Sequence, residues 1–432
     1  MNSIPTILSE KIDDDLYILS TNNIILVYAP LRQRIFPIKE KKGYEKLIAY
    51  FLHNQPDPEL EIFLKENGLT TQPRKVKTRR EKDYEAINLT LSLTSNCNLR
   101  CKYCYAYAGD THKSIPWETI QQAIEISIEA NRRIGKKTFK LLFHGGGEPT
   151  IEWKKLQKAT ELVKHLWGGL TRFSVVTNGT LITDEKAKWL KENNFRITVS
   201  LDGPKDVHDL QRVKANGEGS FDDCLRGMMF LKKHHINFGI RATITQNNLH
   251  RIKELLLIAK AFHCGLKVEP LTLTGRATEE MVGISYQEFF LAFNDAKDFA
   301  DQLDIRFTST YSHTIKTKTE FCSGNGEMFC ILPDGQVSSC TRVTRSQDEL
   351  SDRFIIGKID SDGDLLLDYE KIAFLRDLSI QNFEQCQDCF AKWYCTGGCH
   401  HTRLSNNGNM SEEHCLLIKA MLFNILITKL EF

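Results

Sequence analysis

Apolar segments of strand length alternate with segments of helical periodicity through the middle of the chain. The strand-like segments are residues 87–94, 139–144, 173–177, 196–201, 237–245 and 266–273. Between them apolar positions recur at the helical spacing, for example over 117–133, 153–167, 221–234 and 252–262. Six such units predict an α/β fold with a parallel sheet and right-handed crossovers, because parallel strands need a long connection that is usually a helix.

The first 82 residues follow a different pattern. Two apolar runs, 16–19 and 24–28, flank Thr21-Asn22-Asn23, which predicts a hairpin with asparagine in the turn. Helical patterns follow over 44–52 and 59–67, and Gly68 ends the second. We therefore expect a small α+β module over residues 1–82. Its last residues, 74–82, form a basic run that is most simply a solvated linker, with contact to an acidic peptide as the alternative.

The bulk composition excludes several classes of function. The 432 residues are 41% hydrophobic and 26% charged, which suits a folded chain of more than one domain. A net charge of +2 gives no electrostatic basis for nucleic acid as a partner. Without an apolar run of membrane-spanning length or a signal peptide, we expect a cytoplasmic protein that does not bind membranes. Thirteen cysteines in that reducing compartment favour metal binding or catalysis over disulfides.

The most informative chemistry lies in the run Cys97-Asn98-Leu99-Arg100-Cys101-Lys102-Tyr103-Cys104, directly after the first strand-like segment. Cysteine-only cluster sites normally use four ligands. Three thiolates on one short loop therefore suit a four-iron cluster whose fourth iron is open to a reactant. A zinc loop or a set of buried thiols is the alternative, but structural zinc sites take four ligands, commonly as two spaced pairs.

This CX3CX2C run, with an aromatic residue before its last cysteine, resembles the radical SAM superfamily. The resemblance implies a partial, open (β/α)6 barrel over residues 83–309. It also implies that Cys97, Cys101 and Cys104 hold a [4Fe-4S] cluster whose free iron chelates S-adenosylmethionine (SAM). Reductive cleavage of SAM then gives the 5′-deoxyadenosyl radical.

Glycine and polar residues follow the strand-like segments, where parallel βα folds place their working groups. The run Gly145-Gly146-Gly147-Glu148 resembles the family motif that binds the amino group of SAM. The resemblance implies further SAM contacts from Tyr103, Thr177, Asn178, Ser200, Asp202 and Arg212. Their simpler roles are turn residues and, for Arg212, a surface arginine. For Arg241 and Glu269, on the fifth and sixth segments, we expect a buried salt bridge, and side chains that point into the barrel are the alternative.

The last quarter of the chain carries a second set of cysteines, with the spacing CX12GX4C, a gap, CX2CX5CX3C, a gap and a final cysteine. This spacing resembles the SPASM domain, expected over residues 310–432, which holds auxiliary iron–sulfur clusters. The resemblance assigns the nearer cluster to Cys322, Cys330, Cys340 and Cys399, and the farther cluster to Cys386, Cys389, Cys395 and Cys415.

Three points about these cysteines stay open. The family motif does not require Cys330, and without it the nearer cluster has an open iron for substrate. One or two zinc sites are the alternative to clusters, because Cys386-Gln387-Asp388-Cys389 suits zinc and His400 and His401 follow Cys399. Cys224 and Cys264 lie outside both sets and are expected to be ordinary buried thiols.

Together these features predict a radical SAM oxidoreductase that uses SAM and three [4Fe-4S] clusters to form an oxidative crosslink in a ribosomally made precursor peptide. Its partners would be that peptide and a low-potential electron donor such as flavodoxin or ferredoxin. An anaerobic sulfatase-maturating enzyme and a zinc-binding scaffold protein are the alternatives. The 96 residues before Cys97 favour the peptide maturase, and they resemble winged-helix peptide-recognition modules; a packing extension is the simpler interpretation. No acid or base is assigned.

Overall fold

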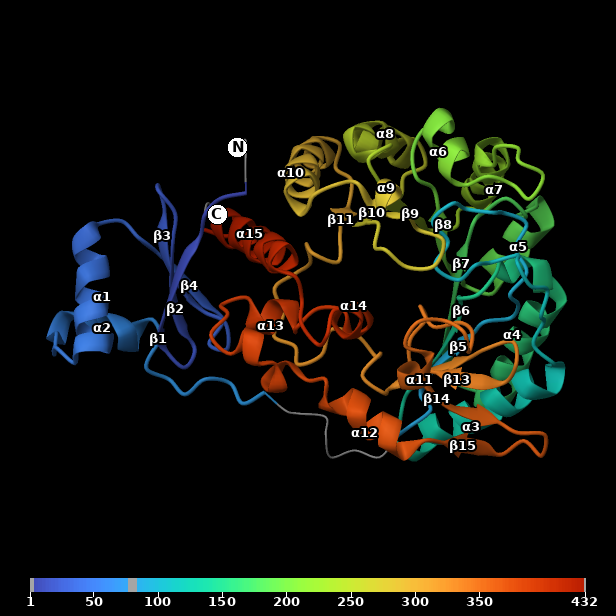
Figure 1. Ribbon diagram of the computed structural model, residues 1–432, viewed down its shortest axis with the longest axis horizontal. Coiled ribbons are helices and arrows are strands. Elements are labelled where there is room, and N and C mark those ends of the chain that lie inside the picture. Colours follow the sequence, from blue (N-terminus) through green and yellow to red (C-terminus); the bar gives the residue numbers. More distant parts are fainter. Residues whose placement is uncertain (1–3, 77–83, 431–432) are drawn as a thin grey trace. The chain divides into compact units, whose positions relative to one another are not determined.

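The structure is a computed structural model that describes residues 4–76 and 84–430, and the chain forms two compact units (Figure 1). The first, here called the terminal unit, consists of residues 1–81, 311–322 and 377–432. The second, here called the barrel unit, consists of residues 82–310 and 323–376.

The three consecutive domains expected from the sequence remain a prediction. Residues 323–376, from the expected C-terminal domain, are compact with the barrel unit. The expected boundary at residue 82 and residues 77–82 of the basic run lie outside the described residues.

The N-terminal part of the terminal unit is an antiparallel sheet followed by two helices. The sheet has the order β1-β2-β3-β4, with strands β1 (Leu8–Asp13), β2 (Leu16–Ser20), β3 (Ile25–Ala29) and β4 (Arg34–Ile38). The expected hairpin is confirmed as β2 and β3, where Ile18 pairs with Val27. Helices α1 (Lys41–His53) and α2 (Pro58–Glu66) confirm the two helical patterns.

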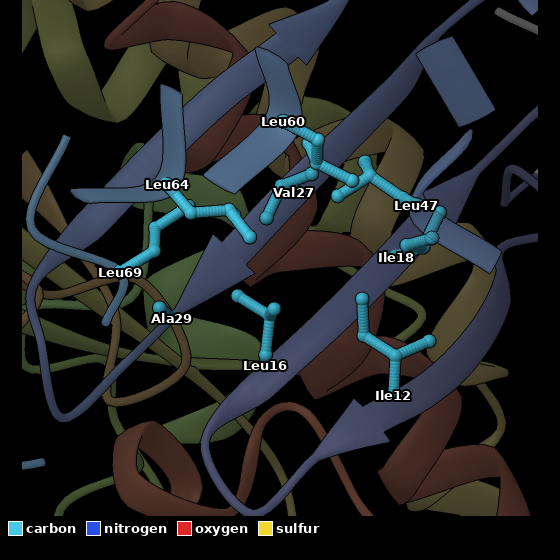
Figure 2. Packing of buried hydrophobic residues seen from close by; sticks show 9 residues of the cluster. All are labelled: Ile12, Leu16, Ile18, Val27, Ala29, Leu47, Leu60, Leu64 and Leu69. Atoms are coloured by element: carbon cyan, nitrogen blue, oxygen red, sulfur yellow. The ribbon is translucent and has the colours of Figure 1, made fainter. Parts of the chain in front are cut away.

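Apolar residues of this sheet pack against α1 and α2. Figure 2 shows the buried set: Ile12, Leu16, Ile18, Val27, Ala29, Leu47, Leu60, Leu64 and Leu69. Asp57 caps α2 by accepting the Leu60 N–H at 3.0 Å, and Pro58 occupies the first helical position, where its missing N–H costs nothing. The module therefore has a core of its own.

The barrel unit contains the expected parallel sheet. Its six predicted strands are β5 (Asn88–Leu91), β6 (Thr138–Phe143), β7 (Leu170–Thr177), β8 (Arg196–Ser200), β9 (Phe238–Ile244) and β10 (Gly265–Pro270). The intervening helices are α3 (Trp117–Arg133), α4 (Trp153–Trp167), α5 (Asp184–Glu192), α6 (Lys205–Gln211), α7 (Phe221–Lys233) and α8 (Ile252–Ala261). Every neighbouring pair from β5 to β10 is parallel, as the alternation predicted.

Helices such as α3, α4 and α8 pack on one face of this sheet. Along β6 the residues on that face, such as Phe139, are buried, and the Phe139 ring lies 5.7 Å from that of Trp167 on α4. Figure 1 shows the helices along the outer side of the sheet. The opposite face carries polar residues, including the exposed Lys140 on β6 and Arg241 on β9. This inner face is the one available to ligands.

Strands that the sequence did not predict extend the sheet at both ends, to 11 strands. β11 (Phe307–Thr308), which follows α9 (Glu279–Val282) and α10 (Tyr286–Gln302), pairs with β10. At the other end β12 (Met328–Ile331) pairs in parallel with β5, and β13 (Gln336–Ser338), β14 (Ile355–Ile359) and β15 (Leu365–Leu367) continue antiparallel. Helices α11 (Ser351–Phe354) and α12 (Tyr369–Asp377) flank the last strands in sequence.

The C-terminal part of the terminal unit is helical and rich in cysteine. Its helices are α13 (Lys392–Cys395), α14 (His400–Ser405) and α15 (Glu412–Thr428). Cys415 lies in the first turn of α15, as expected for a ligand that returns along a helix. Among the described residues, no helix has the length and apolar character needed to cross a membrane.

Candidate functional site

Cys97, Cys101 and Cys104 lie together on the loop that follows β5. Burial raises the pKa of Cys97 to about 12, and the charges of Glu148, Cys101 and Cys104 act on it as well. Backbone N–H groups already point at the sulfurs, since Leu99 donates to Cys97 Sγ and Ala108 donates to Cys104 Sγ, each at 3.4 Å. Hydrogen bonds to sulfur are one means by which proteins tune iron–sulfur clusters. The donor set therefore fits such a cluster.

The loop is held from one side by the ends of the neighbouring βα units. The N–H groups of Arg100 and Lys102 donate to the carbonyls of Val213 and Gln211 at 2.7 and 3.0 Å. Asn98, next to Cys97, is joined to the end of β7: it accepts from Asn178 Nδ2 at 3.0 Å and donates to Thr180 Oγ1 at 2.8 Å.

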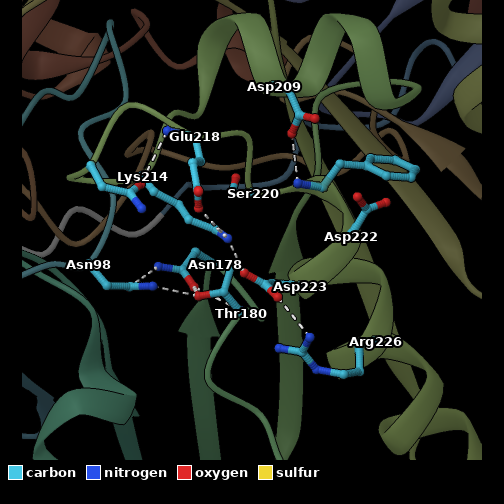
Figure 3. Close-up of polar contacts among 12 residues, drawn as sticks. Asn98, Asn178, Thr180, Asp209, Lys214, Glu218, Ser220, Asp222, Asp223 and Arg226 are labelled. Carbon is cyan, nitrogen blue, oxygen red and sulfur yellow. Dashed lines mark hydrogen bonds and ion pairs between the residues drawn. The ribbon is translucent and has the colours of Figure 1, made fainter.

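Figure 3 shows Asn98, Asn178 and Thr180 pointing toward one another. It also shows the adjoining ion pairs of Asp223 with Lys214 and Arg226, at 2.6 and 2.7 Å. The second of these lies on the surface of α7, whereas Lys214 pairs with Leu99 of the cysteine loop. The β7 end is thus a support for the cysteine loop in addition to its expected role in SAM binding.

On the other side the loop is clamped by Gly275 and Arg276, two residues that the sequence did not single out. The Arg276 N–H donates to the Cys104 carbonyl at 3.1 Å, and its side chain donates to the carbonyls of Cys101 and Ala108 at 3.5 and 3.0 Å. Gly275 has φ +65°, and a Cβ there would lie 2.5 Å from the Cys104 carbonyl oxygen. Nothing in the sequence around residue 275 signals this contact, because the two segments are 170 residues apart.

The glycine run after β6 packs directly against the residues that precede Cys97. A Cβ on Gly146 would lie 2.7 Å from the Thr94 carbonyl oxygen, and one on Gly147 would lie 1.8 Å from that of Asn96. Gly145 has more room, since a Cβ there would meet only the Ser92 side chain at 3.6 Å. Close packing therefore explains two of these glycines without any ligand.

Glu148 is buried, with 3% of its surface exposed, and its carboxylate accepts four hydrogen bonds. Oε1 accepts from the Thr150 N–H and hydroxyl at 3.1 and 2.6 Å and from the Thr177 hydroxyl at 2.7 Å. Oε2 accepts from the Asn178 N–H at 2.8 Å. A carboxylate has about four lone-pair sites. Three of the four hydrogen bonds go to Oε1, so Oε2 can still accept a hydrogen bond from an ammonium group.

Tyr103, Asp202 and Arg212 form one buried group beside Cys101. The Tyr103 hydroxyl donates to Asp202, and Arg212 Nη1 donates to the same hydroxyl. Arg212 is only 11% exposed and lies 3.6 Å from Asp202 Oδ2, so the simpler expectation of a surface arginine is wrong. Its Nε has no hydrogen-bond partner among the described residues, which leaves a buried donor for a ligand such as a carboxylate.

The expected buried salt bridge between Arg241 and Glu269 is wrong. Glu269 Oε1 instead binds Lys267 Nζ and the Thr310 N–H, each at 2.9 Å. Arg241 is exposed on the inner face, in register with Ser200 on β8 and Lys267 on β10. Lys267 lies two residues before Glu269 on the same face of β10. It forms the ion pair with Glu269 that was expected of Arg241 on β9.

The cysteines assigned to the nearer cluster divide between the two units. Cys322 and Cys399 belong to the terminal unit, and Cys330 and Cys340 to the barrel unit. Cys330 is buried and pairs with Thr90, so it faces the inner side of the sheet. Within the barrel unit, burial raises the pKa of Tyr105, and the charges of Cys104, Cys330 and Cys340 contribute. Tyr105 is therefore near both the first cysteine loop and these two thiols.

The four cysteines assigned to the farther cluster gather within the terminal unit. Burial raises the pKa of Cys389 to about 11, and that of Cys395 is raised by burial and by Cys389, Cys386 and Cys415. Such mutual electrostatic effects require the four thiols to be close neighbours. Cys224 and Cys264 are buried, as expected.

No three His, Cys, Asp or Glu side chains among residues 4–76 and 84–430 are arranged to hold a single metal ion. A zinc site brings all its ligands to within about 2.0–2.3 Å of one point. Within each unit, therefore, no three of the described cysteines converge on one point.

Comparison with known proteins relates this arrangement to one enzyme superfamily. Residues 91–258, which include the first cysteine loop and the ends of β6 to β8, match the radical SAM superfamily. The cysteine-type anaerobic sulfatase-maturating enzyme of Clostridium perfringens is 27% identical over 343 residues, which cover 74% of this chain and 90% of the relative.

Two solved structures share the fold. Native anSMEcpe with bound AdoMet and Cp18Cys peptide has a TM-score of 0.63 at 21% identity, over 79% of this chain and 98% of that one. Streptococcus suis SuiB bound to precursor peptide SuiA has a TM-score of 0.51 at 12% identity, over 92% of this chain and 97% of that one. The second likeness thus extends over more of the chain than the first.

Proposed function

Because the chain is a radical SAM enzyme related to the anaerobic sulfatase-maturating enzymes, we propose that it modifies a ribosomally made peptide by forming an oxidative crosslink. In this proposal Cys97, Cys101 and Cys104 hold the cluster that binds SAM. When bound, that cluster and SAM would supply the chemistry for abstraction of a hydrogen atom, and the auxiliary clusters would supply an acceptor for the electron that remains when a proton is also lost and the new bond closes. SAM and iron–sulfur clusters are common to this class of enzyme; the count of three [4Fe-4S] clusters is part of the proposal.

The residues around the cysteine loop would bind and orient SAM. Glu148 Oε2 would accept from the amino group, and the unpaired Nε of Arg212 would donate to the carboxylate, so that each charged group of the amino acid moiety has a charge-assisted partner. Tyr103 and Asp202 hold Arg212 in place. Thr177 and Asn178 orient Glu148, and Ser200 faces the same inner side as Arg241. The glycine run brings Glu148 against the cysteine loop.

The N-terminal module is the feature that supports a peptide maturase over a sulfatase-maturating enzyme. The likeness to SuiB, whose structure holds a precursor peptide, covers 92% of this chain, against 79% for the sulfatase-maturating enzyme. The module's sheet ends in β1, an edge strand that offers unpaired backbone groups to an extended peptide, whereas the other edge strand, β4, contains Pro37. We propose that a precursor peptide pairs with β1 and that flavodoxin or ferredoxin supplies the electron.

Formylglycine formation is the second candidate, because sulfatase-maturating enzymes match 74% and 78% of this chain in sequence. The two reactions leave different products. A crosslink removes two hydrogens and joins two residues of the peptide, while formylglycine carries an aldehyde.

The test is anaerobic reconstitution followed by assays with two kinds of peptide. We expect about twelve irons per chain, a broad absorbance near 400 nm and reductive cleavage of SAM. With a candidate precursor peptide, tandem mass spectrometry should show a new bond between two residues. If a sulfatase peptide is the substrate instead, its product will carry an aldehyde that a hydrazide reagent captures. That result would establish the second candidate. A colourless chain that holds about two zinc ions and does not cleave SAM would overturn both and leave the zinc scaffold.

A further inference from the structure

Arg403 is a fully buried cation in the cysteine-rich part of the terminal unit. It lies on α14, and only 1% of its surface is exposed. Among the described residues no carboxylate forms an ion pair with it. An arginine side chain cannot lose its proton in a protein, and a buried charge without a partner of opposite sign is costly. The position therefore calls for an anion.

The neutral partners of Arg403 do not supply one. Its Nε and Nη2 donate to the Gly397 carbonyl at 3.0 and 2.9 Å, and Nη1 donates to that of Gly408 at 2.7 Å. Its guanidinium carbon lies 3.9 Å from the centre of the Phe383 ring. These contacts orient the planar guanidinium group and satisfy most of its five N–H donors. They do not neutralise its positive charge.

The remaining partner is a thiol. Arg403 Nη2 donates to Cys386 Sγ at 3.7 Å, and the charge of Arg403 also acts on Cys415. Metal binding requires these cysteines to be thiolates. A metal centre held by Cys386, Cys389, Cys395 and Cys415 would therefore place the missing negative charge beside the guanidinium.

We propose that Arg403 is the charge partner of the metal centre at these four cysteines and that it raises the reduction potential of that centre. The proposal rests on the proposed function, in which this centre is an auxiliary cluster. A nearby cation favours the reduced, more negative state of a cluster, and net charge and hydrogen bonds to sulfur are recognised means of tuning the potential. Arg403 would act as a positioning residue for electron acceptance and would not touch the substrate.

The first test is a redox titration followed by electron paramagnetic resonance. The measurements use a chain that combines Cys97→Ala, Cys101→Ala and Cys104→Ala. This chain lacks the ligands of the first cluster, so only the auxiliary clusters contribute to the signal. Arg403→Met, which keeps the length and removes the charge, should shift the reduction equilibrium of one cluster about tenfold toward the oxidised state, which equals about 59 mV for one electron. Arg403→Lys should shift it less. Lys419→Gln, which removes a half-buried cation whose charge also acts on Cys389 and Cys415, is the comparison variant. A shift as large as that of Arg403→Met would assign the effect to net charge near the cysteines and overturn the specific role of Arg403.

The second test separates charge pairing from a purely structural role. Urea unfolding is measured for the full chain, with and without bound metal. If Arg403 only ties the carbonyls together, Arg403→Met will destabilise both forms equally and leave the potential unchanged, and either result overturns the proposal. If it pairs with the centre, the metal-loaded form will lose more stability than the metal-free form. Should the chain hold zinc, the proposed function fails, yet this comparison still decides the role of Arg403.

Discussion

Glu148 Oε2 accepts the backbone N–H of Asn178 at 2.8 Å, which joins the end of β6 to the end of β7. The same carboxylate accepts from Thr177 and Thr150, so one buried anion orders four donor groups on three residues from two βα units. Asn178 in turn contacts Asn98 beside Cys97. Glu148 thus connects the expected SAM site to the expected cluster site, and its loss should affect both.

Replacing this carboxylate with an amide tests the connection. Glu148→Gln places an NH2 group among groups that donate, so we expect the free energy of unfolding to fall by about 1–3 kcal/mol, the cost of buried unsatisfied groups. SAM affinity should fall as well. Urea unfolding and equilibrium dialysis with labelled SAM measure the two effects. Glu152→Gln is the control: its partly exposed pair with Lys155 at 3.6 Å should contribute at most about 1 kcal/mol.

Gly275→Ala should release the first cluster while leaving the auxiliary clusters in place. The new methyl group would lie 2.4 Å from the Tyr105 Cα and 2.5 Å from the Cys104 carbonyl oxygen, so the cysteine loop must move. We expect the reconstituted chain to lose about four irons, one cluster's worth, as measured by iron analysis.

The control for this change separates crowding from backbone strain. Gly135 has φ +69°, close to the +65° of Gly275, and a Cβ there meets nothing within 4 Å. Gly135→Ala should therefore cost about 1–2 kcal/mol of stability and no iron. Equal iron loss in both variants would mean that the left-handed conformation, and not contact with the loop, is what matters at residue 275.

The parallel sheet could be predicted because its strands are buried and separated by long amphipathic helices. β6 to β10 each have five to eight residues, enough to show an apolar run. β11, β13 and β15 have two or three residues, which is too short for a period of two to be recognised. Their pairing with the sheet is fixed by tertiary contacts that no local pattern reports.

The candidate site was only partly predictable for a similar reason. Cysteine spacing and strand-end position are local, so they indicated Cys97 to Cys104 and Glu148. Arg276 and Arg403 act on cysteines through contacts made in the fold, and an arginine in the sequence is by default a surface residue. The exposed Arg241 shows the opposite error, since the expected partner Glu269 is taken by Lys267.

Stability below neutral pH should depend on His208. Its Nδ1 accepts the Asp202 N–H at 3.3 Å, so Nε2 carries the proton and donates to Ser220 Oγ at 3.0 Å. Burial lowers the pKa of His208 to about 3. Between pH 6.5 and 3 the unfolded chain binds a proton that the folded chain excludes, so stability falls with decreasing pH by up to about 1.4 kcal/mol per unit.

His208→Gln removes this titration and keeps a donor for Ser220. We expect the metal-free variant to lose stability less steeply than the wild type between pH 6.5 and 5, in urea unfolding at several pH values, with no difference in slope above pH 7. Parallel curves for the two proteins across the acidic range would show that His208 is not held neutral in the folded state.

Single cysteine replacements in the two cysteine groups should have different effects. Cys101→Ala should abolish SAM cleavage, because two thiolates leave the first cluster without enough ligands. Cys386→Ala should retain some SAM cleavage that is not coupled to peptide modification, because Cys386 belongs to the other compact unit. It should abolish formation of the modified peptide. Assays of 5′-deoxyadenosine and of peptide product distinguish the two. Metal binding also contributes to folding, so circular dichroism must accompany the Cys386→Ala assay. Equal loss of cleavage and product in a folded Cys386→Ala chain would contradict separate roles for the two clusters.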